Sequence, residues 1–359
     1  MTGARLRQNV PMRVVVATDR MGELSSADVG SAIATGWQRT APETELAVVA
    51  MGEAGRGFGA AAADHILAEP AYVAGDGVFL VAAGATTLVI SVERDLTHKE
   101  WVPQHSSADL GHLIAEEVRR HQPRHLVVDL GGLNTQDGGA GLLAGLGARA
   151  DRPLDEGVEA LSGVRDVDLA PVQLLLRDVS RVDVVVPAEQ TDVPLLGLRG
   201  TTSLRGSAQG IDAPQMLAAD TALAEFAAAV APEAATLPGA GACGAAFGLV
   251  AAAGARVLSG PGWCADSVGF DTTLRQSQLA LTATESFDFA SRGGSVVQYL
   301  ADVAQEALRP CVALAAEVLI GSREMRTMGI EAAYALGAPE VDRAALADLG
   351  ARVARTWDR

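Results

Sequence analysis

The order of the elements near the N-terminus limits the fold class of this chain. The segment 13-RVVVA-17 is a run of branched apolar residues, typical of a strand that is buried on both faces. An amphipathic helix is expected within 18–38, with Ser25 or Ser26 as its N-cap. The segment 45-ELAVVAM-51 then predicts a second buried strand. A strand, a helix and a strand in this order form a βαβ unit, which requires a parallel sheet.

The middle of the chain has a different texture from its two ends. Segment 71–93 contains short, turn-separated apolar runs that favour antiparallel strands, and 172–187 is a further β-rich patch. Alternation of strands and helices returns from about residue 278 to the C-terminus. We therefore expect an α/β fold in which both chain ends form a parallel-sheet domain (1–68 and 277–359) and residues 69–276 form an inserted α/β domain.

Composition limits the possible partners and location. The chain has 359 residues and a formal net charge of −16, which argues against a nucleic acid or an anionic membrane surface as its main partner. Lys99 is the only lysine, so any binding of anions falls to arginines, backbone amides or a metal ion. No signal peptide is apparent, and no apolar run is long enough to span a bilayer. The three cysteines have no CxxC spacing, so we expect a reduced, cytoplasmic protein.

Several common nucleotide-binding and catalytic motifs are absent or lie in the wrong context. The segment 239-GAGACG-244 matches GxGxxG, but no strand precedes it, so we interpret it as a close-packed helix start rather than an NAD site. There is no GxxxxGK[ST], GxSxG or HExxH motif.

The strongest local signal is 129-DLGGLNTQDGGAGLLAGLG-147, which follows the apolar run 126-LVV-128. A glycine-rich turn between a strand and a helix lets backbone amides approach a phosphate, but it also occurs as a plain tight turn. The residues leave both interpretations open. Asp137 in this turn could hold Mg²⁺ or cap the helix that follows.

The chain resembles the bacterial class I glycerate kinases along nearly all of its length. The family motif GLGGSATNDGGAG is matched by 129-DLGGLNTQDGGAG-141. The family motifs PDSFKGSLSA, MADGGEGT, NPLxGxxGA, PGAGAAGG and TGEGRLDxQTxxGK look like, in the same order, 18-TDRMGELSSA-27, 51-MGEAGRGF-58, 193-VPLLGLRGT-201, 238-PGAGACGA-245 and 282-TATESFDFASRGGS-295.

The resemblance implies a fold and an activity. The family phosphorylates D-glycerate with ATP and Mg²⁺, and its fold is a flavodoxin-like α/β domain with a second α/β domain inserted. It implies binding of a small hydroxy acid and a nucleotide in a cleft between the domains, with phosphate or nucleotide binding by Gly131, Gly132, Asn134, Gly138 and Gly139. On the same basis Asp19, Asp137 and Asp288 are candidates for catalysis, Asp137 for metal binding, and Arg199 and Arg292 for substrate binding. The structural alternatives for these residues are a helix cap or turn for the aspartates and a solvated loop for Arg199.

Several charged residues of the family pattern are changed in this chain. The early family lysine has no counterpart, and the family asparagine of NPL is Val193. The other changed positions are Glu53, Arg56, Thr284, Ser286 and Ser295, and Glu285 lies one step from the position of the family glutamate. The prediction is therefore a glycerate-kinase-like phosphotransferase. The alternatives are a catalytically degenerate member that binds a metabolite or acts in regulation, and a kinase for another sugar acid. The sequence does not predict the oligomeric state.

Overall fold

The computed structural model describes residues 11–74, 78–93, 103–337 and 340–358. Within them the chain forms two compact units. Unit 1 comprises the described residues of Met1–Met51 and Cys264–Arg359, and unit 2 comprises those of Gly52–Trp263. Unit 1 is thus discontinuous and unit 2 is inserted in it, as expected for the fold class. Each unit has its own parallel sheet and its own apolar core.

Unit 1 is a five-stranded, entirely parallel sheet with the order β13-β12-β11-β1-β2. Counted along the chain this is the order 2-1-3-4-5 of flavodoxin-like sheets. Its elements are β1 (Arg13–Thr18), α1 (Ser26–Thr40), β2 (Glu45–Ala50), α10 (Phe270–Gln276), β11 (Leu279–Asp288), α11 (Gly294–Glu306), β12 (Cys311–Leu319), α12 (Ser322–Thr327), β13 (Ala332–Ala335) and α13 (Arg343–Trp357).

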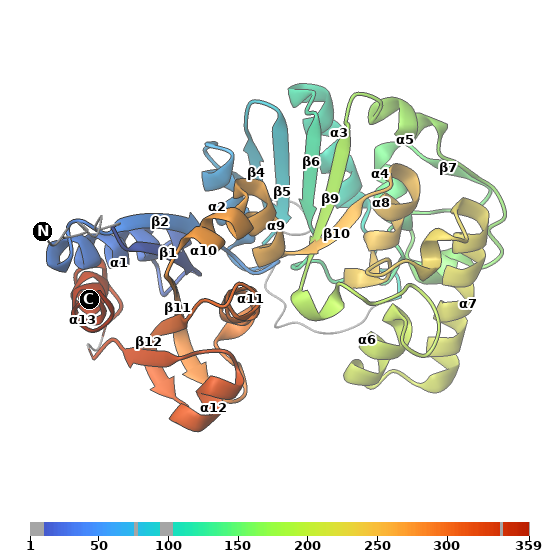
Figure 1. Cartoon of the computed structure of the whole chain (residues 1–359). Helices are drawn as coiled ribbons and strands as arrows, with labels where there is room; N and C mark the ends of the chain where they lie inside the picture. The colour runs from blue at the N-terminus through green and yellow to red at the C-terminus, as the bar shows by residue number, and fades with distance from the viewer. Residues whose placement is uncertain (1–10, 75–77, 94–102, 338–339, 359) are drawn as a thin grey trace, which may run out of the picture. The chain divides into compact units, whose positions relative to one another are not determined.

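The helix expected after the first strand is present, and Ser25 is its N-cap, because the Ser25 hydroxyl accepts a hydrogen bond from the amide of Asp28. Helix α1 packs against α13, and these two helices lie on one side of the unit 1 strands, with α11 on the other (Figure 1). The apolar sides of α1 and α13 bury Ile33, Trp37 and Leu349 against the strands.

Unit 2 has a six-stranded sheet with the order β10-β9-β6-β5-β4-β3. Strands β10, β9, β6 and β5 are parallel, whereas β5, β4 and β3 are antiparallel neighbours. Its strands and helices are α2 (Phe58–His65), β3 (Ala71–Ala74), β4 (Val78–Ala83), β5 (Thr87–Val92), α3 (Ala108–His121), β6 (His125–Asp129), α4 (Ala140–Leu146), β7 (Arg149–Ala150), β8 (Val167–Asp168), α5 (Ala170–Leu175), β9 (Arg181–Val186), α6 (Thr201–Gln209), α7 (Ala213–Val230), α8 (Ala246–Ala253) and β10 (Arg256–Ser259). Helix α9 (Gly260–Val268) contains the boundary between unit 2 and unit 1, after Trp263.

The antiparallel strands expected within 71–93 are confirmed. The expected strand at 172–187 is only partly present, because residues 170–175 form the short helix α5 and strand β9 begins at Arg181. Pro171 lies in the first turn of α5, where its fixed φ favours a helix and its missing N–H is not needed.

The boundaries between the units differ from those expected at 68/69 and 276/277. Helix α2 packs on β4 and β5, so it belongs to unit 2, and α10 packs on β1, so it belongs to unit 1. Among the described residues, no helix is both long and apolar enough to cross a membrane.

Candidate functional site

The glycine-rich segment 130–139 connects β6 to α4 in unit 2. Strand β6 ends at Asp129 and α4 begins at Ala140. Open α/β sheets bind ligands beyond the carboxyl ends of their parallel strands. The segment therefore lies at the edge of the unit 2 sheet where a ligand is expected.

Asp137 fixes the conformation of this turn. Its fully buried carboxylate accepts hydrogen bonds from the amide (2.8 Å) and hydroxyl (2.9 Å) of Ser107 and from the amides of Gly139 (2.9 Å) and Gly141 (3.2 Å). Burial raises the pKa of Asp137, and the hydrogen bonds from Ser107, Gly139 and Gly141 only partly offset this effect. These contacts join the start of α4 to the residue that precedes α3. Of the two roles expected for Asp137, these contacts fit that of a helix cap.

The adjoining glycines are required by the backbone. Gly138 and Gly139 have φ of 65° and 82°, and a Cβ on Gly139 would lie 2.3 Å from the carbonyl oxygen of Ala245. The amide of Gly138 donates to the carbonyl of Gly244 (2.8 Å), and that of Gly139 donates to Asp137. Both amides are therefore engaged within the chain.

Gly131 and Gly132 lie against a second glycine turn, residues 52–57. A Cβ on Gly55 would lie 2.4 Å from backbone atoms of Gly131 and Gly132, so the two turns approach more closely than side chains would allow. The carboxylate of Asp129 links them, because it accepts hydrogen bonds from the amides of Gly55 (2.9 Å) and Gly131 (2.8 Å) and from the hydroxyl of Ser91 (2.6 Å).

Sequence reasoning did not identify Asp129. Burial raises its pKa to about 7, an effect that hydrogen bonds from Ser91, Gly55 and Gly131 oppose and the nearby Glu93 carboxylate increases. The available signal was a charged residue that directly continues the apolar run 126-LVV-128. A carboxylate at the end of a fully buried strand has no solvent to reach, so it requires hydrogen-bond donors from neighbouring loops.

Asn134 lies on the side of the loop that contacts α6. Its side-chain oxygen accepts a hydrogen bond from Nη2 of Arg205 (2.8 Å), and Nη1 of Arg205 donates to the carbonyl of Thr135 (2.8 Å). The next residue, Gln136, is buried and donates from Nε2 to the hydroxyl of Thr202 (3.1 Å). Arg199, by contrast, is exposed on the loop before α6.

The remaining candidates, Asp19, Asp288 and Arg292, belong to unit 1. Asp19 follows β1 and accepts a hydrogen bond from the amide of Arg20 (2.7 Å). The next turn is joined to β11, because the amide of Gly22 donates to Oε1 of Glu285 (2.5 Å).

Asp288 ends β11 and organises the turn before α11. Its carboxylate accepts hydrogen bonds from the amides of Ser291 (2.8 Å) and Ala290 (2.7 Å) and from the hydroxyls of Ser291 (2.8 Å) and Ser286 (3.0 Å). These bonds, that from the Ser291 amide first, hold the pKa of Asp288 below its usual value. Arg292 in this turn is exposed and has a left-handed φ of 52°.

The carboxylates present do not form a ready metal site. Among the described residues, no group of three or more His, Cys, Asp or Glu side chains is arranged to hold a metal ion. A metal on Asp137 would have to displace the donors that occupy its carboxylate. Asp137 therefore does not fit the metal-binding role that the sequence suggested.

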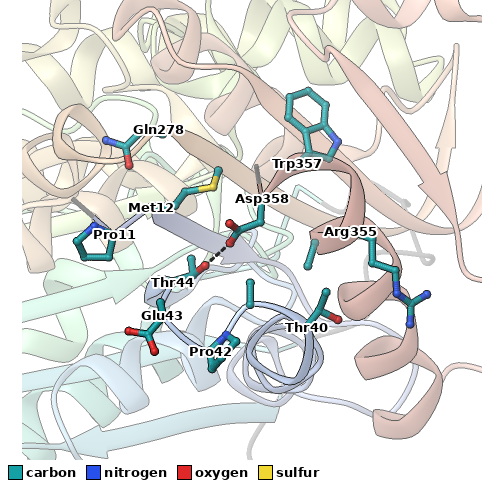
Figure 2. A pocket seen from close by; sticks show the side chains of 12 residues that line it. Pro11, Met12, Thr40, Pro42, Glu43, Thr44, Gln278, Arg355, Trp357 and Asp358 are labelled. Atoms are coloured by element: carbon teal, nitrogen blue, oxygen red, sulfur yellow. Dashed lines mark hydrogen bonds between the residues drawn. The ribbon is translucent and has the colours of Figure 1, made fainter. Parts of the chain in front are cut away.

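A cavity of about 620 Å³ lies elsewhere in unit 1 (Figure 2). It is lined by residues that precede strands, including Met12 before β1, Thr44 before β2 and Gln278 before β11. The hydroxyl of Thr44 and the carboxylate of Asp358 form a hydrogen bond across it. These are the amino ends of the strands, opposite the edge where ligands of such sheets bind.

Comparison with known proteins agrees with this fold. The glycerate kinase family model matches residues 14–358. An uncharacterized protein of Mycobacterium bovis is 29% identical over 90% of this chain and 84% of its own length. The glycerate kinase of Neisseria meningitidis is 29% identical over 79% of this chain and 80% of its own. The crystal structure of a putative glycerate kinase 2 from Salmonella typhimurium superposes with a TM-score of 0.77 at 21% identity, covering 97% of this chain and 99% of that one.

Proposed function

This chain belongs to the glycerate kinase family, and from that premise we propose that it transfers the terminal phosphoryl group of ATP to a hydroxyl of a small hydroxy acid such as D-glycerate. The observation that carries the proposal is the extent of the family match, which runs from residue 14 to residue 358 and so includes both units. The relative from Neisseria meningitidis, which has the name glycerate kinase, matches this chain over most of its length.

Phosphoryl transfer depends on the positioning of charged groups more than on covalent chemistry by the enzyme. The proposal gives the loop 130–141 the binding of a phosphate or nucleotide. In it Asp137 holds the loop in place, because all its observed contacts are to donors of the chain. The amides of Gly131, Gly138 and Gly139 and the side-chain oxygen of Asn134 have partners within the chain, so Gly132 is the better candidate for ligand contact among the residues expected to bind phosphate.

The proposal gives Asp19 the role of orienting or deprotonating the reacting hydroxyl. Asp19 directly follows β1, at the carboxyl edge of the unit 1 sheet, and its side chain is half-buried. Asp288 is instead a positioning residue, because its carboxylate forms the turn that carries Arg292. Mg²⁺ accompanies ATP in kinases of this kind, and no step of the proposal depends on a metal held by Asp137.

A second candidate is a family member that binds a metabolite without turnover. The observation that favours it is that Asp137 and Asp288, two of the three expected catalytic carboxylates, are each occupied by hydrogen bonds within the chain. A fold can retain such structural carboxylates after catalysis is lost.

The experiment is a phosphoryl-transfer assay with purified full-length protein, MgATP and D-glycerate, compared with Asp19→Asn. The matched control is Asp348→Asn, whose side chain is 79% exposed on α13 and pairs only with Arg39 in the observed contacts. We expect turnover by the wild type and by the control, and a loss of at least about 100-fold in Asp19→Asn. Absence of phosphorylation of D-glycerate and of related hydroxy acids by the wild type would remove the kinase proposal in favour of the second candidate.

A further inference from the structure

Arg205 is a half-buried cation in α6 whose charge is not balanced by a carboxylate in the described part of the chain. Its observed partners are two neutral oxygens, the carbonyl of Thr135 and the side-chain amide oxygen of Asn134. No ion pair of Arg205 with a described acidic residue is found, and burial lowers its pKa. A charge that is partly removed from water without a counter-charge is costly, so a site of this kind favours the arrival of an anion.

The guanidinium has further N–H groups that these two hydrogen bonds do not use. An arginine can present such groups as a pair to a carboxylate, which gives both geometric specificity and a strong charge-assisted interaction. The chain as a whole carries a formal charge of −16, so acidic residues outnumber basic ones. An arginine without a carboxylate partner is therefore unexpected in this protein.

A second unsatisfied group lies on the same side of α6. Gln136 is 3% exposed, and its Oε1 has no hydrogen-bond partner among the residues that the structure describes, whereas its Nε2 donates towards the hydroxyls of Thr201 (3.4 Å) and Thr202 (3.1 Å). Thr201 precedes Arg205 by four residues, so both lie on one face of the helix, against segment 134–136. The backbone amides of Thr135 and Gln136 also donate to no acceptor among the described residues.

We propose that Arg205 and Gln136 form the subsite for the hydroxy-acid end of the substrate, with the carboxylate on the Arg205 guanidinium and a hydroxyl donating to Oε1 of Gln136. The inference rests on the proposed function. A hydroxy acid supplies both groups that this subsite lacks, an anion for the cation and a donor for the unpaired oxygen. A nucleotide phosphate supplies only the anion. This assigns the substrate carboxylate to Arg205 rather than to the exposed Arg199.

The test measures binding separately from turnover. The affinities of the wild type for D-glycerate, for glycerol and for MgATP are determined by calorimetry. The same measurements are made on Arg205→Gln and on the matched control Arg177→Gln, which makes the same charge change at a side chain of unit 2 that is 68% exposed. We expect D-glycerate but not glycerol to bind the wild type, and Arg205→Gln to weaken D-glycerate about 10- to 100-fold while MgATP binding stays within about twofold.

Gln136→Met provides a second variant that leaves Arg205 in place. We expect it to bind D-glycerate about 5- to 10-fold more weakly, and to bind 3-hydroxypropionate, which lacks the 2-hydroxyl, as the wild type does. If Arg205→Gln does not fold, Arg205→Lys keeps the charge without the paired donors and is expected to weaken D-glycerate by about tenfold.

The failures of the two proposals can be told apart. A wild type that binds D-glycerate through Arg205 but transfers no phosphate would remove the kinase function and leave the subsite. Turnover of D-glycerate with an unchanged KM in Arg205→Gln would overturn the subsite and leave the kinase function. The subsite is also overturned if Arg205→Gln weakens MgATP instead of D-glycerate, or if the wild type binds no hydroxy acid.

Discussion

The raised pKa of Asp129 has a direct consequence for the stability of unit 2. In the folded chain its pKa rises from 3.8 to about 7, chiefly through burial. The folded state therefore holds this proton more tightly than the unfolded chain does. The resulting stabilisation is complete below pH 3.8 and is lost as the pH rises through about 7, by a total of about 4 kcal/mol at about 1.4 kcal/mol per pH unit.

Asp129→Asn should abolish this pH dependence while preserving the local hydrogen bonds. An asparagine oxygen can accept from the amides of Gly55 and Gly131, and its NH₂ can donate to Ser91, whose hydroxyl lies 2.8 Å from Oε1 of Glu93. Between pH 5 and pH 8 the wild type should lose about 2.5 kcal/mol of unfolding free energy that the variant keeps. The unfolding free energy of the variant minus that of the wild type should therefore increase by about 2.5 kcal/mol from pH 5 to pH 8.

The assay is urea unfolding at pH 5, 6, 7 and 8. Unfolding is monitored by pulsed hydrogen exchange of peptides from β6 and β9, which report on unit 2. Other titrating groups cancel in the difference between variant and wild type. Asp178→Asn is the matched control, because it makes the same substitution at a side chain that is 68% exposed and pairs with the adjacent Arg177. A difference for Asp129→Asn that stays within about 0.5 kcal/mol from pH 5 to pH 8 would refute the reasoning.

Three further outcomes follow from the same loops and their surroundings. Asp137→Ala leaves its buried donors without an acceptor and should lower the unfolding free energy of unit 2 by about 3 kcal/mol or more, against less than about 0.5 kcal/mol for Asp178→Ala in the same urea assay. Gly139→Ala places a Cβ 2.3 Å from a carbonyl oxygen and should lower the melting temperature far more than Gly210→Ala, which has φ of 72° and no atom within 4 Å of the added Cβ. Burial raises the pKa of the Cys243 thiol to about 12, so this residue should not react with a disulfide reagent at pH 8 in the native protein. It should react in the urea-unfolded protein, and tryptic mapping would show the difference.

The elements with strong local patterns were predictable from the sequence. The helix expected within 18–38 is present as Ser26–Thr40 with Ser25, one of the two expected N-caps, and the strand expected from about residue 278 begins at Leu279. The helix at 170–175 was missed because Val172, Leu174 and Leu175 suggest a strand, whereas Pro171 and the chain's return to β9 favour a turn of helix.

The candidate site was predictable only as a segment. Motif resemblance identified residues 129–141, but it could not assign roles within them, because the role of each group depends on neighbours distant in sequence. Asp137 contacts Ser107, and Asp129 contacts Gly55 and Ser91. No local pattern contains these pairs.

The contacts also indicate whether the similarity of segment 129–141 to the family motif reflects a shared fold or a shared reaction. Asp129, Gly138 and Gly139 are explained by packing and hydrogen bonds within unit 2, so their presence indicates a shared fold more strongly than a shared reaction. What the loop binds must then depend on side chains in or beside it that keep an unbalanced charge or an unpaired polar atom. Arg205 and Gln136 meet this condition in the described chain, since one is a cation without a counter-charge and the other has an oxygen without a donor. The choice of substrate is therefore expected to lie in α6 and residues 134–136, and sequence changes there should alter specificity while leaving the glycine turns unchanged.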